Sequence, residues 1–205
     1  MIDRYKIAGE QGRFESGSNG TVLENKLGVI DPNEMNDAEL YLLRSLYEVV
    51  FVDEFPERQI TVIDLKRWHY RWLGNIYGWA GEERSVNMAK DGFQFAAAAQ
   101  ITRLLNVFER DCLARYTPCT VFDDEMLIQA LAVTHVEFIL VHPFREGNGR
   151  LGRLLADVMT SQAGRGLLDY RPWDMNRQAY YAAIQAGVGC DYEPMQDLMS
   201  AALHR

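Results

Sequence analysis

Apolar residues recur every three or four positions along most of this chain, which is the spacing of one face of an α-helix. The clearest such faces lie near residues 36–51, 61–76, 101–112, 123–141, 151–159, 176–184 and 194–202. The segment 123–141 is apolar almost throughout and is too long for an ordinary strand, so it predicts a buried helix. The pattern as a whole predicts a mainly α protein.

Capping residues suggest where the first two of these helices begin. Asn36 followed by Glu39 resembles a capping box, in which two side chains satisfy free backbone N–H groups at a helix start. Thr61 and Asp64 give the same signal for the next helix. We therefore expect helices that begin near these two pairs.

The long apolar helix has a start signal and a stop signal. Asp123 can cap its beginning through its carboxylate. Pro143 disfavours the α conformation at the residue before it, so the helix is expected to end at His142. This imidazole would then sit at a helix end, where a loop can present it to a ligand.

One strand signal interrupts the helices, between residues 84 and 95. Asp91-Gly92 is a dipeptide typical of tight hairpin turns, and hydrophobic side chains lie on both sides of it. These are Val86, Met88, Phe93 and Phe95. We expect a small β-hairpin here.

Composition narrows the classes of function. The chain has 205 residues, a net charge of −8 and a hydrophobic fraction of 48%, which fit one globular domain. We expect an irregular, glycine-rich N-terminal arm over residues 1–35, with a regulatory role, and a helical domain over residues 36–205.

The acidic net charge argues against a nucleic-acid or anionic membrane surface. Three widely spaced cysteines, and the absence of a signal-peptide pattern or a long apolar run, predict a cytoplasmic protein.

Twelve residues, 142–153, concentrate chemical groups. His142 is a candidate proton acceptor, and Glu146 is a candidate metal ligand. Gly147-Asn148-Gly149 lets a ligand approach the backbone at the start of the following helix, where free N–H groups attract anions. Arg150 and Arg153, three positions apart, lie on one helix face and can add charge-assisted bonds of about 1.5–3 kcal/mol each. The segment therefore predicts a site for a nucleoside triphosphate beside a base.

This segment resembles the signature of Fic-domain proteins, His-x-Phe-x-Asp/Glu-Gly-Asn-Gly-Arg-x-x-Arg. The specified positions match at His142, Phe144, Glu146, Gly147, Asn148, Gly149, Arg150 and Arg153. The resemblance implies a single Fic-type helical domain in which the hairpin at 84–95 is a flap over the active-site cleft. It also implies that Phe144 points into the core and anchors the loop.

The resemblance further implies an enzyme that transfers AMP from ATP to a Tyr, Ser or Thr hydroxyl of a target protein. His142 would act as the general base, and Glu146 would hold Mg²⁺ that bridges the phosphates. The Gly147-Asn148-Gly149 backbone and the Asn148 side chain would cradle the α-phosphate region. Arg150 and Arg153 would neutralise the phosphates.

Partners and regulation follow from the same resemblance. The target protein is expected to pair with the flap by strand addition. Many Fic proteins carry an inhibitory helix of pattern Ser/Thr-x-x-x-Glu-Gly/Asn, and residues 20–25 come near it, with Gly20 in place of the hydroxyl residue. Under this hypothesis Glu24 pairs with Arg153, and Glu24→Gly raises activity. The alternatives are a separate antitoxin-like regulator or no regulator.

The residues leave some other functions open and argue against others. A Fic-type fold that uses another nucleotide, phosphorylates its target, or holds a nucleotide without catalysis stays open, although Gly-Asn-Gly-Arg differs from the lysine-containing loop of the phosphorylating Doc toxins. His135 and Glu137 match half of a zinc deaminase signature, whose Pro-Cys-x-x-Cys half is missing. No Gly-Lys-Ser/Thr phosphate loop occurs. His69, flanked by tryptophans, is expected to pack in the core.

Overall fold

The computed structural model describes residues 10–90 and 92–203. Met1-Ile2-Asp3-Arg4, which carry no signal-peptide pattern, and Asp91 of the expected turn lie outside these residues. Within them the fold is mainly helical, with one two-stranded antiparallel sheet, which confirms the predicted fold class. Along the chain the helices are η1 Glu10–Gly12, α1 Pro32–Glu48, η2 Val49–Asp53, α2 Val62–Leu73, η3 Ala98–Gln100, α3 Ile101–Phe108, η4 Glu109–Leu113, α4 Ala114–Tyr116, α5 Asp124–Val141, α6 Asn148–Gln162, α7 Arg171–Met175, α8 Arg177–Ala186, η5 Gly187–Gly189 and α9 Glu193–Leu203.

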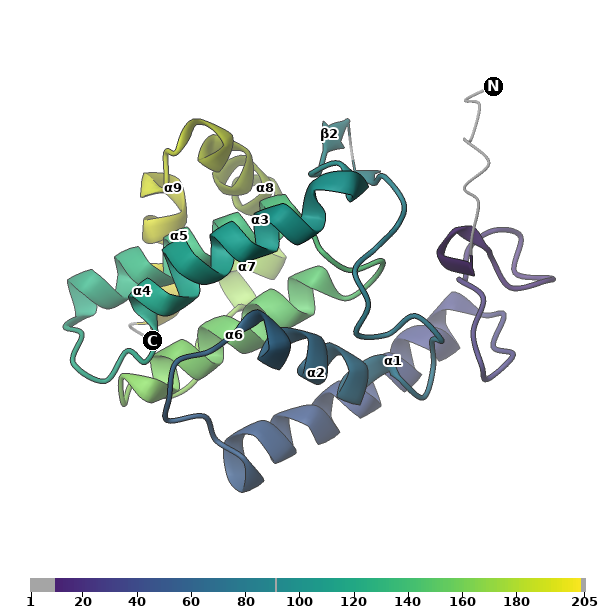
Figure 1. The fold of residues 1–205 in the computed structure, drawn as a ribbon, viewed down its shortest axis with the longest axis horizontal. Helices are drawn as coiled ribbons and strands as arrows, with labels where there is room; N and C mark the ends of the chain where they lie inside the picture. Colours follow the sequence, from purple (N-terminus) through teal and green to yellow (C-terminus); the bar gives the residue numbers. More distant parts are fainter. Residues whose placement is uncertain (1–9, 91, 204–205) are drawn as a thin grey trace.

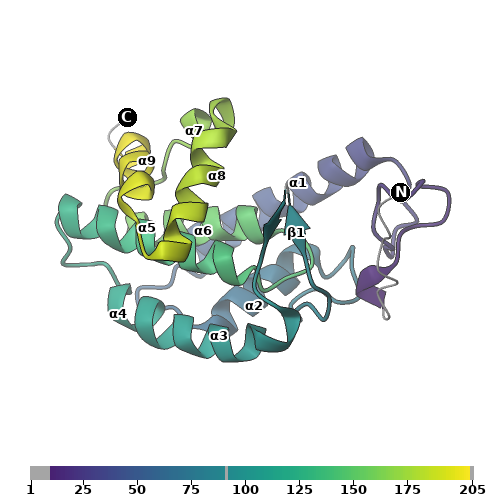
Figure 2. The ribbon, with the colours of Figure 1, turned by 90° about the horizontal axis from the view of Figure 1, so that it is seen from above.

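The helices α5 and α6 form the centre of the molecule (Figure 1). Figure 2 shows α7–α9 gathered on one side of α5 and the α3–α4 run on the opposite side. α1 packs on α2, and α2 contacts α6. Because α5 is surrounded in this way, it buries side chains around most of its circumference. None of the helices in the described part of the chain is long and apolar enough to cross a membrane.

The first long helix begins at Pro32, and the expected start at Asn36 is wrong. The Asp31 side chain accepts hydrogen bonds of 2.8 and 3.1 Å from two backbone N–H groups of the first turn. Proline at the first helical position lacks the N–H that would be unsatisfied there and has the helical φ already fixed. Asp31-Pro32 is therefore the stronger start signal. Glu39 is buried about two turns further along the helix, and its carboxylate does not cap the helix start.

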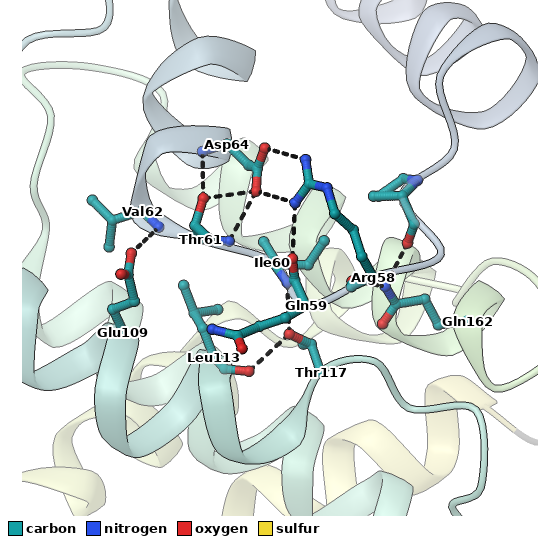
Figure 3. A network of polar contacts seen from close by, with 11 residues as sticks. Arg58, Gln59, Ile60, Thr61, Val62, Asp64, Glu109, Leu113, Thr117 and Gln162 are labelled. Atoms are coloured by element: carbon teal, nitrogen blue, oxygen red, sulfur yellow. Dashed lines mark hydrogen bonds and ion pairs between the residues drawn. The ribbon is translucent and has the colours of Figure 1, made fainter.

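The second long helix begins with the predicted capping box of Thr61 and Asp64 (Figure 3). Arg58 donates two hydrogen bonds, of 2.7 and 2.8 Å, to the Asp64 carboxylate. Burial alone would raise the pKa of Asp64, but the hydrogen bonds from Arg58 and Thr61 lower it to about 2. The carboxylate of Glu109 accepts a hydrogen bond from the backbone of Val62, so the network also ties α2 to the α3–α4 run.

The hairpin is present but shorter than its hydrophobic pattern suggested. β1 Ala89–Lys90 pairs antiparallel with β2 Phe93–Gln94. Gly92 has a φ of 82°, which fits the turn signal. The hairpin arms, which are the segments before β1 at Val86 and after β2 at Ala96, are joined to the end of α5 by hydrogen bonds of Arg84.

Candidate active site

A cleft of about 630 Å³ opens between the signature segment, the hairpin and α8. Its volume lies within the range of roughly 300–1,000 Å³ typical of small-molecule sites. The structure brings together at this cleft the predicted residues His142, Glu146, Gly147, Asn148, Gly149, Arg150 and Arg153. Lys90, Phe93 and Phe95 line it from the hairpin, and Tyr180 and Tyr181 from α8.

His142 ends α5 in the left-handed conformation, with a φ of 49°. Pro143 disfavours the right-handed helical conformation at this position, so the chain turns here as expected. The Nδ1 atom lies 3.2 Å from the carbonyl oxygen of Ile139. A carbonyl can only accept, so Nδ1 carries the proton and Nε2 is left as the acceptor of the ring. Phe95 of the hairpin arm stacks on the imidazole with ring centroids 3.7 Å apart.

The surroundings of His142 keep its ring neutral. Burial lowers the pKa of His142 to about 4, and the positive charges of Arg84 and Lys90 act in the same direction. At neutral pH the imidazole is therefore uncharged and its Nε2 lone pair is available to a hydroxyl proton.

Phe144 and Asn148 fold the loop that follows. Phe144 is buried, as expected of an anchor, and stacks on His69 with ring centroids 4.0 Å apart. The Asn148 side chain accepts a hydrogen bond from the Phe144 backbone N–H at 2.9 Å and donates one to its carbonyl at 2.7 Å. Both polar groups of this side chain are thus used inside the loop. A ligand would meet the backbone at Asn148, and the amide group acts as a brace for the loop.

Gly147 makes the start of α6 accessible. Its φ is 81°, and a Cβ atom there would lie 2.6 Å from Cζ3 of Trp72, so only glycine fits without a shift. Gly147 is the N-cap of α6 and provides no side-chain cap. The first N–H groups of an uncapped helix lack intrahelical partners and attract anions. Next to it, a side chain at Gly149 would meet open space.

Glu146 is the candidate metal ligand. Its carboxylate lines the cleft, with 43% of the side chain exposed, and its Oε1 accepts a hydrogen bond from the Gly147 N–H at 2.8 Å. In the described part of the chain no cluster of three or more acidic, histidine or cysteine side chains forms a cage for a metal. Mg²⁺ in nucleotide sites is held by one or two carboxylates, substrate phosphates and water, so a single accessible carboxylate fits this ion.

Arg150 forms an ion pair with Glu39, which does not line the cleft and whose role the sequence did not reveal. Its Nη2 lies 2.5 Å from Oε2 of Glu39, and its guanidinium stacks over Trp72 at 4.6 Å. Glu39 is only 5% exposed. Its Oε1 accepts a hydrogen bond of 2.7 Å from the Tyr77 hydroxyl. This arginine is therefore oriented before any phosphate arrives.

Arg153 is paired with Asp174, which comes from α7. The distance from Nη2 to Oδ1 is 2.7 Å, and the guanidinium lies over the Tyr170 and Trp173 rings at 4.9 and 5.8 Å. Asp174 itself lines the cleft and is about half exposed. Asp174 thus pairs with Arg153 at the wall of the cleft, where phosphates would bind.

Glu24 does not reach Arg153 in the part of the chain that the structure describes. It lies 3.7 Å from Arg13 and lines a separate small pocket with Trp79. The segment is held in place because Leu23 forms a β-bridge with Phe14. In this structure Glu24 and Arg153 each have another partner, so the two are not paired as the brake hypothesis requires.

His69 has a larger role than core packing. Gly81 donates its backbone N–H to Nδ1 at 2.8 Å, so Nε2 carries the proton and donates to the carbonyl of Glu146 at 3.0 Å. Burial lowers the pKa of His69 to about 4, which keeps it in this neutral form. The ring thereby joins the signature loop to the segment before the hairpin. Its position among tryptophans on a helix face indicated burial but not this partner.

The two residues of the half deaminase signature have structural partners. His135 is buried, with Nε2 2.9 Å from the Tyr180 hydroxyl and Nδ1 3.3 Å from the Gly152 carbonyl. Glu137 accepts a hydrogen bond of 2.7 Å from the Tyr192 hydroxyl.

Comparison with known proteins identifies the family and the fold. The family model described as Fic/DOC family matches residues 59–160, which include the signature segment. The structure of BepC from Bartonella tribocorum with bound AMPPNP superposes with a TM-score of 0.76 at 20% identity, over 97% of this chain and 99% of that one. A putative cell filamentation protein from Bartonella quintana with bound ADP gives 0.73 at 22% identity, over 94% of each chain. The chain belongs to the Fic/DOC family.

Two relatives carry names that bear on activity. Protein adenylyltransferase VbhT of Bartonella schoenbuchensis is 28% identical over 190 residues, which are 90% of this chain and 37% of VbhT. The probable protein adenylyltransferase y4lH of Sinorhizobium fredii is 25% identical over 143 residues, 70% of this chain and 72% of that protein. The chain therefore spans little more than a third of the first relative and most of the second.

Proposed function

We propose that this chain is a protein adenylyltransferase, which transfers AMP from ATP to a Tyr, Ser or Thr hydroxyl of a target protein. The observation that carries the proposal is the position of a neutral imidazole with an acceptor at Nε2, in a cleft that also holds the N-terminus of α6 and two arginines. A nucleotide-holding module has no need of such a base. The names of the relatives VbhT and y4lH support the same activity.

In the proposed reaction the target hydroxyl gives its proton to Nε2 of His142. Its oxygen forms a bond to the α-phosphorus of ATP, and the bond from that phosphorus to the bridging oxygen of pyrophosphate breaks. The products are the AMP-modified hydroxyl and pyrophosphate. His142 returns to its neutral state when it passes the proton on to solvent or to the leaving group.

The triphosphate would be held by the start of α6 and by Arg150 and Arg153, which stabilise the charge that develops on pyrophosphate. The preorganised contacts of Arg150 with Glu39 support this assignment. Glu146 would hold Mg²⁺, which when bound neutralises part of the phosphate charge.

The target would dock on the hairpin. β1 is exposed and β2 nearly so, and a two-stranded sheet leaves backbone groups free at its outer edges. Strand addition satisfies those groups and would bring the target backbone beside Phe95, which stacks on His142.

The test is transfer of label from α-³²P ATP with Mg²⁺ to proteins of a cell lysate, by wild type and by His142→Ala. We expect label with wild type and a loss of at least about 100-fold in the variant, because a general base contributes roughly 10²–10⁴-fold. ATP binding, measured by calorimetry, is expected to persist in His142→Ala.

A second donor, γ-³²P ATP, separates the alternatives. Label from the γ position only would establish phosphorylation, and ATP binding without label from either position would establish a binding module or another donor nucleotide. Equal transfer by wild type and His142→Ala would contradict the proposed mechanism.

A further inference from the structure

Arg84 lies at the base of the hairpin and is almost fully buried, with 2% exposure. Its guanidinium donates to the carbonyl of His142 through Nε at 2.6 Å, to that of Val86 through Nη1 at 2.5 Å and to that of Ala96 through Nη2 at 2.5 Å. Nη2 also lies 3.4 Å from the carbonyl of Val141. Its own backbone N–H donates to Pro143 at 2.8 Å.

These partners belong to three places in the chain. Val86 is on the arm that enters the hairpin, and Ala96 is on the arm that leaves it. His142 and Val141 are at the end of α5, where the last carbonyls of a helix lack intrahelical partners. One side chain therefore joins both arms of the hairpin to the backbone of the candidate base. A direct backbone bond from Ala96 to Leu140, at 3.2 Å, lies beside this junction.

Burial of a guanidinium is costly unless its nitrogens are hydrogen-bonded, and each of the three guanidinium nitrogens of Arg84 donates to a carbonyl. All the hydrogen-bond partners of Arg84 in the described residues are neutral carbonyls. Burial, and secondarily the charge of Arg145, lower the pKa of Arg84 to about 10, which still leaves it charged at neutral pH. The end of α5 carries partial negative charge that favours a cation there.

We propose that Arg84 is a positioning residue that fixes the flap relative to the imidazole of His142, so that a target docked on the hairpin presents its hydroxyl to Nε2. This inference rests on the proposed transfer reaction. Arg84 does not line the cleft, so in the described structure it acts through the flap and through His142. The stacking of Phe95 on His142 depends on the same arm, because Phe95 precedes Ala96.

The nucleotide site is held by other contacts. Arg150 and Arg153 belong to α6 and are paired with Glu39 and Asp174. Loosening of the flap is therefore expected to leave these two arginines, and with them the phosphate contacts, in place. Loss of Arg84 is expected to affect how the target and the base meet, and this gives the proposal a signature that general destabilisation would not produce.

The test compares Arg84→Lys with wild type and with Arg110→Lys. Lysine keeps the charge but replaces the planar fork of donors by a single ammonium, so it cannot reach both hairpin arms and α5 together. Arg110 is a surface arginine paired with Asp111, and its replacement serves as the control. For Arg84→Lys we expect transfer of label from α-³²P ATP to the lysate proteins that wild type labels to slow about 10- to 100-fold, and the affinity for ATP to change less than about twofold. Arg110→Lys is expected to match wild type.

Hydrogen exchange of the ATP-free protein provides an independent readout. In Arg84→Lys the amides of Phe95 and Ala96 are expected to exchange at least about tenfold faster, while those of α6 keep their protection. Unchanged protection in the hairpin would overturn the proposal, and so would a parallel loss of ATP binding and of α6 protection. If no variant transfers AMP, the proposed function fails, and the exchange rates alone decide whether Arg84 fixes the flap.

Discussion

Glu39 holds Arg150 on the side away from the cleft, because it is buried and does not line the cleft in the described structure. Glu39→Gln removes the charge of this pair and leaves Arg150 free to adopt other rotamers. We expect ATP affinity to fall about tenfold, which is about 1.4 kcal/mol. Calorimetric titration with ATP and Mg²⁺ measures this. Unchanged affinity would show that Trp72 and Glu146, which lies 3.4 Å from the guanidinium, orient Arg150 without Glu39.

Asp174 is predicted to have the opposite effect on the other arginine. Its carboxylate is half exposed and lines the cleft, so it competes with phosphate for Arg153 and repels the triphosphate. An exposed ion pair contributes only about 0.2–1 kcal/mol. A multiply charged ligand can therefore displace Asp174 from Arg153 with little loss of free energy. We expect Asp174→Asn to tighten ATP binding about three- to fivefold in the same titration. Weaker binding would mean that Asp174 orients Arg153 for the phosphate.

At the scale of elements, the start of α2 depends on Asp64, which caps the helix and binds Arg58. Since the pKa of Asp64 in the folded protein is about 2, below its ordinary value of about 3.8, the carboxylate stabilises the fold above pH 4 and loses this effect as pH falls toward 2. We expect Asp64→Asn to lower the free energy of unfolding by about 2 kcal/mol at pH 7. Urea unfolding at pH 7 and pH 3 checks both points.

The control for this prediction is Asp111→Asn, which removes an exposed partner of Arg110 and is expected to leave stability unchanged. A constant difference between wild type and Asp64→Asn from pH 7 to pH 3 would contradict the role of the charge. It would leave a role for the cap geometry alone.

Local signals explain why some elements were predictable from the sequence. The cap pair Thr61 and Asp64 and the stop at Pro143 involve neighbours in the chain, and the structure confirms them. Glu39 was misassigned as a cap because its partner Arg150 lies 111 positions away. The Arg84 contact to His142 spans 58 positions. Such pairs depend on how helices pack, which hydrophobic periodicity does not encode.

At the scale of the whole molecule, three histidines link folding to pH. Burial lowers the pKa of His69, of His135 and of His142 to about 4, so between pH 6.5 and 4 the unfolded chain binds protons that the folded chain does not. Stability is therefore retained above pH 6.5 and falls as pH drops, by up to about 4 kcal/mol per pH unit for three groups. Urea unfolding between pH 7 and pH 5 measures this slope. His69→Gln is expected to reduce it by about a third, and a flat profile in wild type would refute the linkage.

The neutral partners of Arg84 have a consequence for how the protein responds to salt. Dissolved ions weaken attraction between exposed charges, with a screening length of about 10 Å at 0.1 M ionic strength. Arg150 and Arg153 act through charge on carboxylates and phosphates, so rising salt weakens their hold on a nucleotide. A guanidinium buried among carbonyl dipoles has no counter-ion to lose. Rising ionic strength therefore lowers the fraction of protein that has nucleotide bound. It does not change how the flap is aligned with His142.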